Sequence, residues 1–426
     1  MLSRQTIDVV QTTAPVVAEH AEAITRRFYK LMFAGNPEVL AFFNPAHQHS
    51  GGQQRALAGA ICAYAANIDN LSALGLAIEL IAQKHCSLGI QAEHYPIVGH
   101  YLLVAIQDVL GEAATPEVLA AWGEAYDLLA KTFIDREGEI YAAQRATPGG
   151  WNGYRSFRVQ CKIRENDHIA SFYLTPVDEG PLPPYRAGQY ITVNVERPRL
   201  PASLRNYSLS ERSGTGYYRI SVKRETGAGA ASPTGVVSQV LHDGVHEGDV
   251  LQIGPPCGEF TLDPTALSSR RIVLIAGGIG VTPILAMLKE LAHRRWNSPV
   301  DFIHAVKNSD WRVFEEEIRE ATAGLPNFHC HARFDAPLAD DLARGRCDSV
   351  GVVDLPFLQE LLPDNDAEFY FCGPQPMMTG VHRALKQWGV PDARLHFEFF
   401  GPKQDLNREP IGANESSRTI AAATFA

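Results

Sequence analysis

The hydrophobic pattern of this chain changes twice, and these changes limit the folds that it can adopt. From residue 5 to about 145 the apolar residues recur at helical spacing, as in the stripe of Ile24, Phe28 and Leu31. A Pro-Gly-Gly turn in the segment "ATPGGWNGYRSF" then marks a boundary. Because 426 residues exceed one ordinary core, we expect further domains after the helical one.

Short β-rich runs follow the boundary, and they predict the antiparallel strands of a barrel or a sandwich. These runs are "FRVQCKI", "HIASFYLTP", "QYITVNV" and "YYRISVKR". From about Arg271 strands and helices alternate, which predicts a doubly wound parallel sheet. The polar tail after Pro402 is expected to be disordered. We therefore predict an all-α domain, an antiparallel β-barrel, a doubly wound α/β domain and a tail, at residues 1–146, 147–265, 266–403 and 404–426.

Composition and charge argue against several classes of protein. Apolar residues make up 45% of the chain and charged residues 20%, which is typical of a globular protein. A net charge of -10 without long Lys or Arg runs argues against a nucleic-acid or anionic-membrane binder. There is no secretory signal pattern and no apolar run of roughly 18 residues, so we expect a cytoplasmic protein without membrane insertion. The seven cysteines are scattered singly, which predicts free thiols.

One histidine stands in the middle of the apolar helical segment "IAQKHCSLGI". His85 shares a predicted helix face with Leu74, Ile78, Ile81 and Leu88, and should therefore point inward. Two interpretations remain open from this pattern. His85 is either a buried neutral imidazole satisfied by a hydroxyl or carbonyl group, or the ligand of a metal or haem iron.

Polar side chains on other apolar faces bear on this choice. Gln53 shares a helix face with Leu57, and Tyr29 lies on a face of its own helix with other apolar residues. Considered singly, each is an ordinary interior or half-exposed residue. Considered with His85, the two supply a hydroxyl and an amide donor that suit iron-bound dioxygen. Phe43, in the turn "LAFFNPAH", would form an aromatic wall against a porphyrin.

A carboxylate interrupts the apolar stripe of the last predicted helix of the first domain. That stripe runs directly on to Glu137 and consists of Leu119, Trp122, Tyr126, Leu129 and Phe133. A buried carboxylate is unfavourable unless it is paired. Glu137 therefore either reaches water near the helix end or accepts a hydrogen bond from His85, with Tyr95 completing the set and the imidazole made more basic. Tyr95 precedes Pro96 at a helix start, so it could instead be a hydrophobic staple.

Two glycine-containing strand ends predict a nucleotide site. In "LIAGGIGVTP", Gly277, Gly278 and Gly280 lie between a buried strand and a helix, where the backbone can approach a pyrophosphate at the helix N-terminus. The spacing is not G-x-G-x-x-G, so a plain tight turn remains an alternative. The strand end "FYFCGPQP" places Cys372 and Gly373 at the same sheet edge, where Cys372 could simply fill a buried space.

These two motifs in this order resemble the nicotinamide domain of the ferredoxin reductase superfamily, and "RNYSLS" resembles its R-x-Y-S flavin motif. The resemblance implies that Arg205 pairs with the flavin diphosphate, Tyr207 packs on the isoalloxazine and Ser208 hydrogen-bonds near the reactive nitrogen. Without it, Arg205 could form a surface ion pair and Tyr207 could be an ordinary strand aromatic. Further cofactor contacts implied by the resemblance are Tyr190, Asn206, Gly235, Val237, Ser238, Gly277, Gly278, Ile279, Gly280, Val281, Thr282, Cys372, Gly373 and Pro374.

With the helical domain included, residues 1 to about 402 resemble the bacterial and fungal flavohaemoglobins. Segments that carry this resemblance include "KHCSLGI", "HYPIVGHYLL", "PGGW" and "FEFFGP". It implies haem b, FAD, and NADH or NADPH as cofactors, and nitric oxide dioxygenase activity. NAD(P)H would reduce FAD, FAD would reduce the haem iron one electron at a time, and haem-bound dioxygen would react with nitric oxide to give nitrate.

The same resemblance implies roles for single residues. His85 would be the proximal iron ligand, and Tyr95 with Glu137 would form the proximal relay. Tyr29 and Gln53 would act on the distal side. Lys84 and Glu398 would lie between haem and flavin, Phe43 and Leu57 would line the haem, and the segment Phe399, Phe400, Gly401 and Pro402 would close over the flavin.

Two rival functions remain at this point. A haem-based oxygen or redox sensor would not need the flavin and nicotinamide motifs. A general flavin or haem reductase acting on ferric iron, quinones or lipid hydroperoxides would leave Tyr29 and Gln53 without a purpose. The expected partners are dioxygen, nitric oxide and NAD(P)H, with a lipid in the haem pocket as an open alternative, and we expect a monomer. Lys307, after the strand "FIHAV", does not decide between NADH and NADPH.

Overall fold

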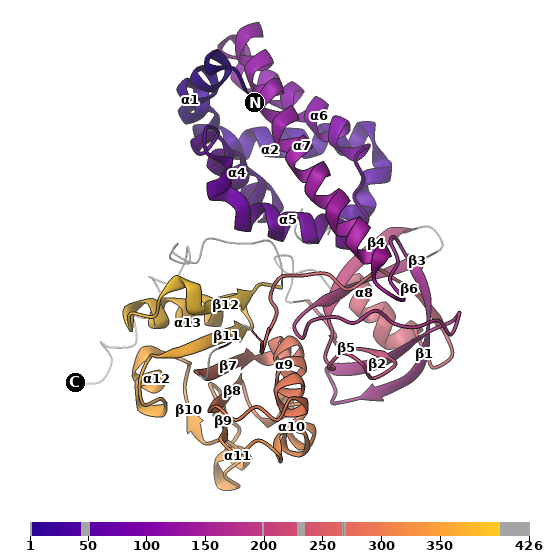
Figure 1. Cartoon of the computed structure of the whole chain (residues 1–426), viewed down its shortest axis with the longest axis vertical. Coiled ribbons are helices and arrows are strands. Elements are labelled where there is room, and N and C mark those ends of the chain that lie inside the picture. Colours follow the sequence, from indigo (N-terminus) through magenta and orange to yellow (C-terminus); the bar gives the residue numbers. More distant parts are fainter. Residues whose placement is uncertain are drawn as a thin grey trace, which may run out of the picture.

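The computed structural model describes residues 2–43, 52–197, 200–227, 235–265, 267 and 270–400. Three parts follow one another along the chain: a bundle of helices, an antiparallel sheet and a parallel sheet covered by helices. The bundle lies at one end of the molecule and the two sheets lie side by side below it, with α5 facing them (Figure 1). The predicted fold class is confirmed.

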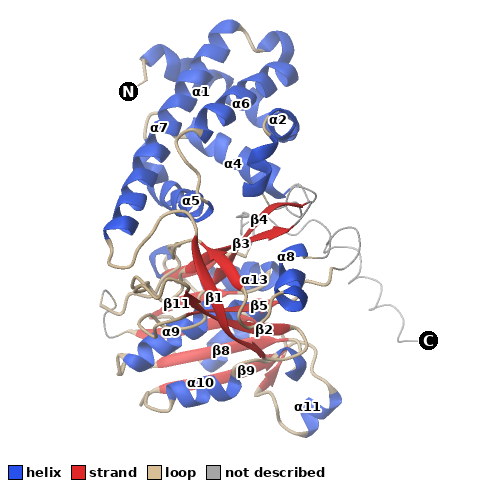
Figure 2. Ribbon diagram, turned by 90° about the vertical axis from the view of Figure 1, so that its right-hand side faces the viewer, coloured by secondary structure: helices blue, strands red, loops and turns tan. Residues whose placement is uncertain are grey.

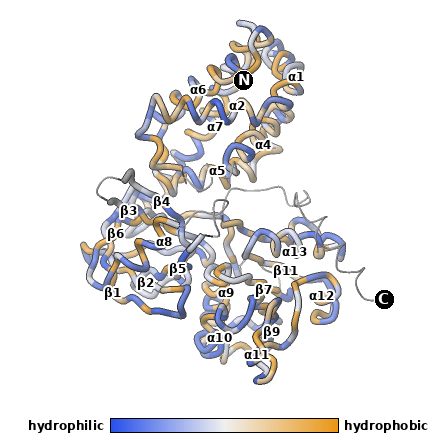
Figure 3. The backbone as a smooth tube through the Cα atoms, turned by 180° about the vertical axis from the view of Figure 1, so that it is seen from behind, coloured by the Kyte–Doolittle hydropathy of each residue, from blue (hydrophilic) through white to orange (hydrophobic). Residues whose placement is uncertain are grey.

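Amphipathic helices build the first part, and hydrophobic and hydrophilic segments alternate along them (Figure 3). Side-chain caps fix two helix starts, because Ser3 accepts the N–H of Thr6 and Thr115 accepts the N–H of Val118. Apolar side chains such as Phe28 meet in one core. The helices are α1 (Arg4–Glu19), α2 (Ala21–Gly35), α4 (Gly52–Ala66), α5 (Gly75–Leu88), α6 (His94–Leu110) and α7 (Pro116–Ala146), with 3-10 turns η1 (Pro37–Phe42), η2 (Leu71–Leu74) and η3 (Gly111–Ala113).

One detail of this part differs from the prediction. Leu74 was expected to lie on the same α-helix as His85, but α5 begins at Gly75. Leu74 ends the preceding 3-10 turn, with a ψ of 4° that lies outside the α-helical range. The His85 stripe on α5 therefore consists of Ile78, Ile81 and Leu88.

Six antiparallel strands form the second part in the order β4-β3-β6-β1-β2-β5. Leu209, directly after β4, bridges to Ile220 of β5, so the two edges of the sheet meet and the barrel closes. Alternate residues such as Phe157 and Val159 point into its core. The elements are β1 (Arg155–Arg164), β2 (Ile169–Pro176), β3 (Tyr190–Arg197), β4 (Leu200–Ser208), β5 (Tyr218–Lys223) and β6 (Val250–Ile253), with α8 (Val236–Gln239) followed by the π-helical turn η4 (Val240–Gly244).

A parallel sheet with the order β10-β9-β8-β7-β11-β12 forms the third part. One apolar cluster lies between the sheet and α9, and another lies between the sheet and α12 and α13. Because β8 and β11 lie on opposite sides of β7, the strand order reverses there, which is where α/β sheets bind ligands. The strands are β7 (Arg271–Gly277), β8 (Val300–Val306), β9 (Phe328–Phe334), β10 (Ser349–Val350), β11 (Ala367–Cys372) and β12 (Leu395–Glu398). The helices are α9 (Val281–His293), α10 (Glu315–Thr322), α11 (Ala339–Ala343), α12 (Leu355–Leu361) and α13 (Gln375–Gln387), with turns η5 (Gly278–Gly280), η6 (Ser309–Trp311) and η7 (Asp392–Arg394).

Apolar contacts join the three parts, which lie against one another in two views (Figures 1 and 2). Tyr190 and Cys257 of the barrel share a buried cluster with residues of α5 and α7. Phe260 of the barrel packs with residues of α9. At the first junction Gly149 has a φ of 78°, and a Cβ there would lie 2.4 Å from the carbonyl oxygen of Pro181, so the turn after α7 requires glycine.

Two further expectations concern the whole chain. All seven cysteines lie in the described ranges and none forms a disulfide, as predicted. Among the described residues, no helix combines the length and the apolar character that a membrane crossing requires.

Candidate active site

His85, Glu137 and Tyr95 meet between α5, α6 and α7. Nδ1 of His85 lies 2.8 Å from Oε1 of Glu137, and the Tyr95 hydroxyl donates to the same oxygen at 2.5 Å. Glu137 is 2% exposed and lies well before α7 ends at Ala146, so the alternative in which it reaches water is wrong. Of the two alternatives that the sequence left open for Glu137, the structure contains the contact with His85 and Tyr95.

This arrangement leaves one imidazole nitrogen for a ligand. A carboxylate only accepts hydrogen bonds, so Nδ1 of His85 carries the proton and Nε2 keeps its lone pair. Burial raises the pKa of the Tyr95 phenol, and the hydrogen bond to Glu137 acts in the same direction, so Tyr95 remains a donor. Phe133 packs beside the imidazole with ring centroids 5.7 Å apart. The ring orientation is therefore fixed on two sides.

One supporting residue of this set was not predicted. The hydroxyl of Tyr126 donates to the backbone carbonyl oxygen of Tyr95 at 2.6 Å and so anchors the first turn of α6. The sequence placed Tyr126 only on the apolar stripe of the last helix. A hydroxyl on an otherwise apolar stripe was the available signal, because a buried tyrosine usually needs a polar partner.

In the other apolar cluster of the helical part, Tyr29 lies among aromatic rings. Its ring centroid is 5.6 Å from those of both Phe33 and Phe43. Burial raises the pKa of the Tyr29 phenol, so the side chain is a neutral hydroxyl donor at physiological pH. Leu57 of α4 packs against the same cluster, and Gln53 lies on α4 and is half-buried. The predicted distal residues thus come from two neighbouring helices, α2 and α4, and the turn after η1.

Residues from all three parts meet next to His85. Nζ of Lys84 in α5 lies 5.3 Å from the ring centroid of Tyr190 in β3. Desolvation lowers the pKa of Lys84 to about 8, while the charge of Glu398 at the end of β12 acts in the opposite direction. Desolvation raises the pKa of Glu398 to about 7, and Lys84 opposes that shift. Lys84 and Glu398 therefore influence each other across the junction between the helical, barrel and α/β parts.

A second link across this junction was not predicted. Nδ2 of Asn206 in β4 donates to Oγ of Ser87 in α5 at 3.1 Å, and Thr192 donates to the amide oxygen of Asn206 at 3.2 Å. The flavin-motif strand is thereby hydrogen-bonded to the helix that carries His85. Ser87 lies within "KHCSLGI" and is fully buried, but its spacing alone did not distinguish it from a core serine.

The R-x-Y-S residues lie on β4 along the barrel wall. Tyr207 packs against the barrel core, and desolvation lowers the pKa of Arg205. Oγ of Ser208 is buried and has no hydrogen-bond partner in the part of the chain that the structure describes. A buried hydroxyl of this kind is unfavourable unless a ligand satisfies it. These three side chains fit the flavin contacts expected of them.

The segment from Gly235 to Ser238 supports this wall. Gly235 is the N-cap of α8, and Val237 and Ser238 are buried. Oγ of Ser238 donates to the carbonyl oxygen of Gly235 at 3.0 Å and accepts the N–H of Glu225 at 3.1 Å. The Ser238 hydroxyl therefore holds this turn against the chain after β5.

The two glycine-containing strand ends lie side by side at the switch point of the parallel sheet. Ala276 of β7 pairs with Cys372 of β11. A Cβ on Gly280 would lie 2.2 Å from the carbonyl oxygen of Cys372, and one on Gly373 would lie 2.9 Å from Cα of Gly277. Close packing between the two loops therefore explains why Gly280 and Gly373 carry no side chain. Gly278 is different, because it has a φ of 49° and a Cβ there would meet nothing within 4 Å, which leaves its side of the loop open for a ligand.

The rest of both motifs completes this edge of the sheet. Ile279 lies in η5, and Thr282 donates from its hydroxyl to the carbonyl oxygen of Ile279 at 3.0 Å, which closes the turn before α9. Val281 is buried at the start of α9, and Pro374 is the N-cap of α13. Both helices therefore begin at the switch point, where their N-termini suit a phosphate.

The chain after β12 was predicted to close over the flavin. Phe399 packs on Phe397, with ring centroids 5.9 Å apart, and Phe400 is 48% exposed. Gly401 and Pro402 lie outside the described residues, as does the tail that follows.

The chain is similar to known proteins over almost its whole length. The family described as Globin matches residues 26–133, and the family described as Oxidoreductase NAD-binding domain matches residues 274–383. A flavohemoprotein of Rhodopirellula baltica is 55% identical over 406 residues, which cover 95% of this chain and 99% of the relative. The chain belongs to the flavohemoprotein family.

Similar solved structures agree with the assignment of the chain to the flavohemoprotein family. The crystal structure of flavohemoglobin from Malassezia yamatoensis, with bound FAD and haem, has a TM-score of 0.83 and 28% identity, and the match covers 94% of this chain and 100% of that chain. The FAD/NAD-binding domain of a nitric oxide dioxygenase from Vibrio cholerae O1 biovar El Tor is 35% identical, with a TM-score of 0.52, over 59% of this chain and 100% of that chain.

Proposed function

We propose that this chain is an NAD(P)H-dependent nitric oxide dioxygenase. Two molecules each of nitric oxide and dioxygen and one NAD(P)H would give two nitrate ions, NAD(P)⁺ and one proton. The observation that carries the proposal is the junction at Lys84, because it joins a globin-type proximal histidine directly to a flavin-type barrel in one polypeptide. Such a junction suits an enzyme that delivers electrons internally.

The residues present fit haem b, FAD and a nicotinamide nucleotide. When bound, the nucleotide supplies a two-electron hydride, the flavin divides it into single electrons, and the haem iron binds dioxygen. Nε2 of His85 would hold the iron, and Arg205, Tyr207 and Ser208 would hold the flavin. The loops at Gly277–Gly280 and Cys372–Pro374 would hold the nucleotide.

The remaining side chains would bind, orient and hold protons. Glu137 keeps the proton on Nδ1 of His85, which orients the ring and strengthens Nε2 as an electron donor. Tyr29 and Gln53 would donate hydrogen bonds to the small ligand on the distal side. The aromatic rings of Phe33 and Phe43 beside Tyr29 exclude water from that hydroxyl.

Several finer features belong to the same proposal. The helical, barrel and α/β domains would span residues 1–146, 147–265 and 266–403. The enzyme would act as a cytoplasmic monomer on dioxygen, nitric oxide and NADH or NADPH, without nucleic-acid partners. A lipid is a further candidate ligand of the haem pocket. The free thiols support the cytoplasmic location. The net charge of -10 supports the absence of nucleic-acid partners.

The test uses the purified protein loaded with haem and FAD. Its visible spectrum is recorded before and after anaerobic NADH, and again after oxygen and limiting nitric oxide. We expect the Soret band to shift to the ferrous position and to return to the ferric position as nitrate accumulates. Flavin bleaching without any shift of the Soret band would instead support a plain reductase. A stable Soret change without nitrate would support a sensor.

A further inference from the structure

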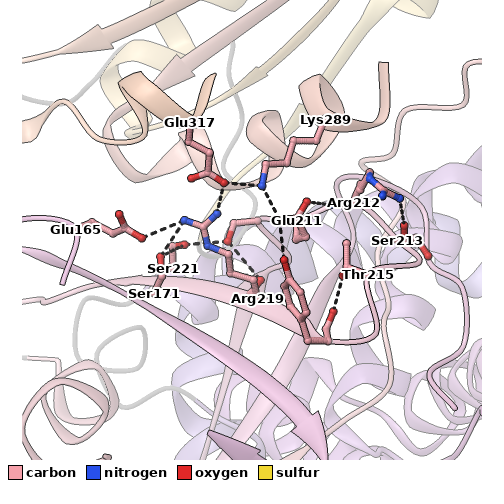
Figure 4. A network of polar contacts seen from close by, with 12 residues as sticks. Glu165, Ser171, Glu211, Arg212, Ser213, Thr215, Arg219, Ser221, Lys289 and Glu317 are labelled. Carbon is pink, nitrogen blue, oxygen red and sulfur yellow. Dashed lines mark hydrogen bonds and ion pairs between the residues drawn. The ribbon is translucent and has the colours of Figure 1, made fainter. Parts of the chain in front are cut away.

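A partly buried charged cluster joins the barrel to the α/β part (Figure 4). Arg219 of β5 is 1% exposed, and its guanidinium pairs with Glu165 at 3.0 Å and with Glu317 of α10. Lys289 of α9 pairs with Glu317 at 2.5 Å and with Glu211, directly beyond β4, also at 2.5 Å. The cluster thus alternates cations and carboxylates across the boundary between two parts of the chain.

The position of this cluster along the chain connects the two cofactor segments. Glu211 follows the strand that carries Arg205, Tyr207 and Ser208. Lys289 lies on the helix whose N-terminus follows the nucleotide loop Gly277–Gly280. The Lys289–Glu211 ion pair therefore fastens the nucleotide helix to the end of the flavin-motif strand.

The barrel holds its side of the cluster rigidly. The backbone N–H of Ser210 donates to the carbonyl oxygen of Arg219 at 2.9 Å, which joins the chain beyond β4 to β5. A nitrogen of the Arg219 guanidinium also donates to Oγ of Ser171 at 3.3 Å. The guanidinium lies over the ring of Phe314, 4.8 Å from its centroid, at the start of α10. Arg219 is thus fixed from both sides of the boundary.

Stability alone does not account for these charges. Among the described residues, the cluster holds the two cations Arg219 and Lys289 and the three carboxylates of Glu165, Glu211 and Glu317. Burial opposes ionisation of Glu317, but hydrogen bonds and charges from Arg219 and Lys289 outweigh it and lower the pKa of this carboxyl. Buried ion pairs often stabilise no more than apolar residues of equal size, whereas their geometry is strict.

The apolar contact between the barrel and α9 does not require such strict geometry. Phe260 and Ile169 of the barrel pack on α9 through hydrophobic burial, which is non-directional and tolerates sliding. Hydride transfer does not tolerate sliding, because reacting atoms must lie about 3 to 3.5 Å apart and a 1 Å misplacement can slow a reaction roughly 100-fold. A directional contact is needed to set the angle between the two parts.

We propose that Lys289 and Arg219 are positioning residues for hydride transfer. Through Glu211 and Glu317 they fix α9, and with it the nucleotide loop, at one angle to the flavin-motif strand. They touch neither cofactor and act only through the relative placement of the two binding segments. This inference rests on the hydride-transfer half of the proposed function and is independent of the reaction with nitric oxide.

The test measures flavin reduction in the enzyme loaded with haem and FAD. Flavin bleaching is followed anaerobically by stopped flow at increasing NADH and NADPH, for wild type, Lys289→Met and Lys289→Arg. We expect the limiting rate of Lys289→Met to fall about tenfold or more, with a smaller change in the nucleotide concentration for half-maximal rate. Lys289→Arg should recover most of the rate, because it restores the cation.

The matched control is Arg294→Met at the C-cap of the same helix. Arg294 pairs with Glu290 within α9 and does not cross the boundary, so we expect the wild-type rate. Flavin-to-haem electron transfer, started by photoreduction of the flavin, should be unchanged in every variant. If Lys289→Met folds poorly, Glu211→Gln and Glu317→Gln provide the same comparison.

Three results would overturn the inference. The first is a wild-type rate of flavin reduction per bound flavin in Lys289→Met, Glu211→Gln and Glu317→Gln. The second is an equal loss in Lys289→Met, Lys289→Arg and Arg294→Met, which would indicate general loosening of α9. The third is a wild-type flavin that neither NADH nor NADPH reduces, and this result alone would also remove the reductase half of the proposed function.

Discussion

Nδ1 of His85 lies 2.8 Å from Oε1 of Glu137, and the two side chains come from helices that cross on the side of the bundle facing the barrel. The carboxylate is only 2% exposed, so its charge acts on the imidazole with less screening than at the surface. A histidine held in this way is a stronger donor to a metal than one bonded to a backbone carbonyl. The electron supply of the proposed iron site thus depends on one buried carboxylate.

Replacement of Glu137 should weaken the electron donation of His85 to the proposed iron without abolishing iron binding. In Glu137→Gln the amide still reaches His85 but carries no charge, so we expect the haem reduction potential to rise and nitric oxide consumption to fall roughly 10- to 100-fold. Spectroelectrochemical titration and steady-state consumption of nitric oxide measure these two effects. Tyr95→Phe, which keeps the carboxylate, should give a smaller change in potential. Equal potentials in wild type and Glu137→Gln would contradict the relay.

Tyr29 provides a test of the other side of the proposed haem site. Tyr29→Phe keeps the ring packing against Phe43 but removes the hydroxyl, so bound dioxygen should dissociate about tenfold faster or more. Stopped-flow displacement of dioxygen measures this rate. Tyr64→Phe is the matched control, because the Tyr64 hydroxyl donates to the carbonyl oxygen of Ala125 at 2.6 Å. It should lower thermal stability and leave dioxygen release unchanged, and equal release rates in all three proteins would remove Tyr29 from the site.

Helical periodicity placed His85 and Glu137 on inward faces, and the penalty for an unpaired buried carboxylate made a contact between them one of two alternatives. The haem roles of these residues were implied only by the resemblance to the flavohaemoglobins. Helical periodicity did not predict the break at Leu74, because a 3-10 turn and the first turn of an α-helix give similar apolar spacing. The apolar periodicity within single helices therefore indicated the inward-facing residues His85 and Glu137, but it did not give the start of α5 at Gly75.

The charged cluster could not be predicted in the same way. Arg219 stands in the strand run "YYRISVKR", where a charged residue normally indicates a solvent-facing position. Lys289 stands in "PILAMLKELAHRR", where it fits the polar side of an amphipathic helix. Arg219 is buried and Lys289 is partly buried because the α/β part covers this side of the barrel, and that packing joins residues as distant along the chain as Arg219 and Glu317. No local pattern contains such information.

Close packing at the nucleotide loop should make one glycine indispensable. In Gly280→Ala the new Cβ would lie 2.2 Å from the carbonyl oxygen of Cys372, so the two loops must separate. We expect the Michaelis constant for NAD(P)H to rise about tenfold or more, since the backbone groups at the helix N-terminus move away from the pyrophosphate. The haem spectrum should not change. Gly380→Ala in α13 is the control, because its Cβ would meet nothing closer than 4.0 Å, and equal Michaelis constants in both variants would contradict a tight nucleotide loop.

The charged cluster predicts a defined acid limit for the contact between barrel and α/β part. The pKa of Glu317 lies below its ordinary value of 4.5, so its ionised form contributes stability that is complete above pH 4.5 and is lost as the pH falls through the lowered value. The thermal midpoint of Glu317→Gln should therefore lie below that of wild type at pH 7, and the difference should shrink below about pH 4.5. Differential scanning calorimetry from pH 7 to pH 3.5 measures both curves. Glu316→Gln is the control, because Glu316 pairs with the exposed Arg319 on the same helix and its replacement should change the midpoint little at any pH. A difference that persists unchanged at the acid end would show that Glu317 acts through its shape and not through its charge.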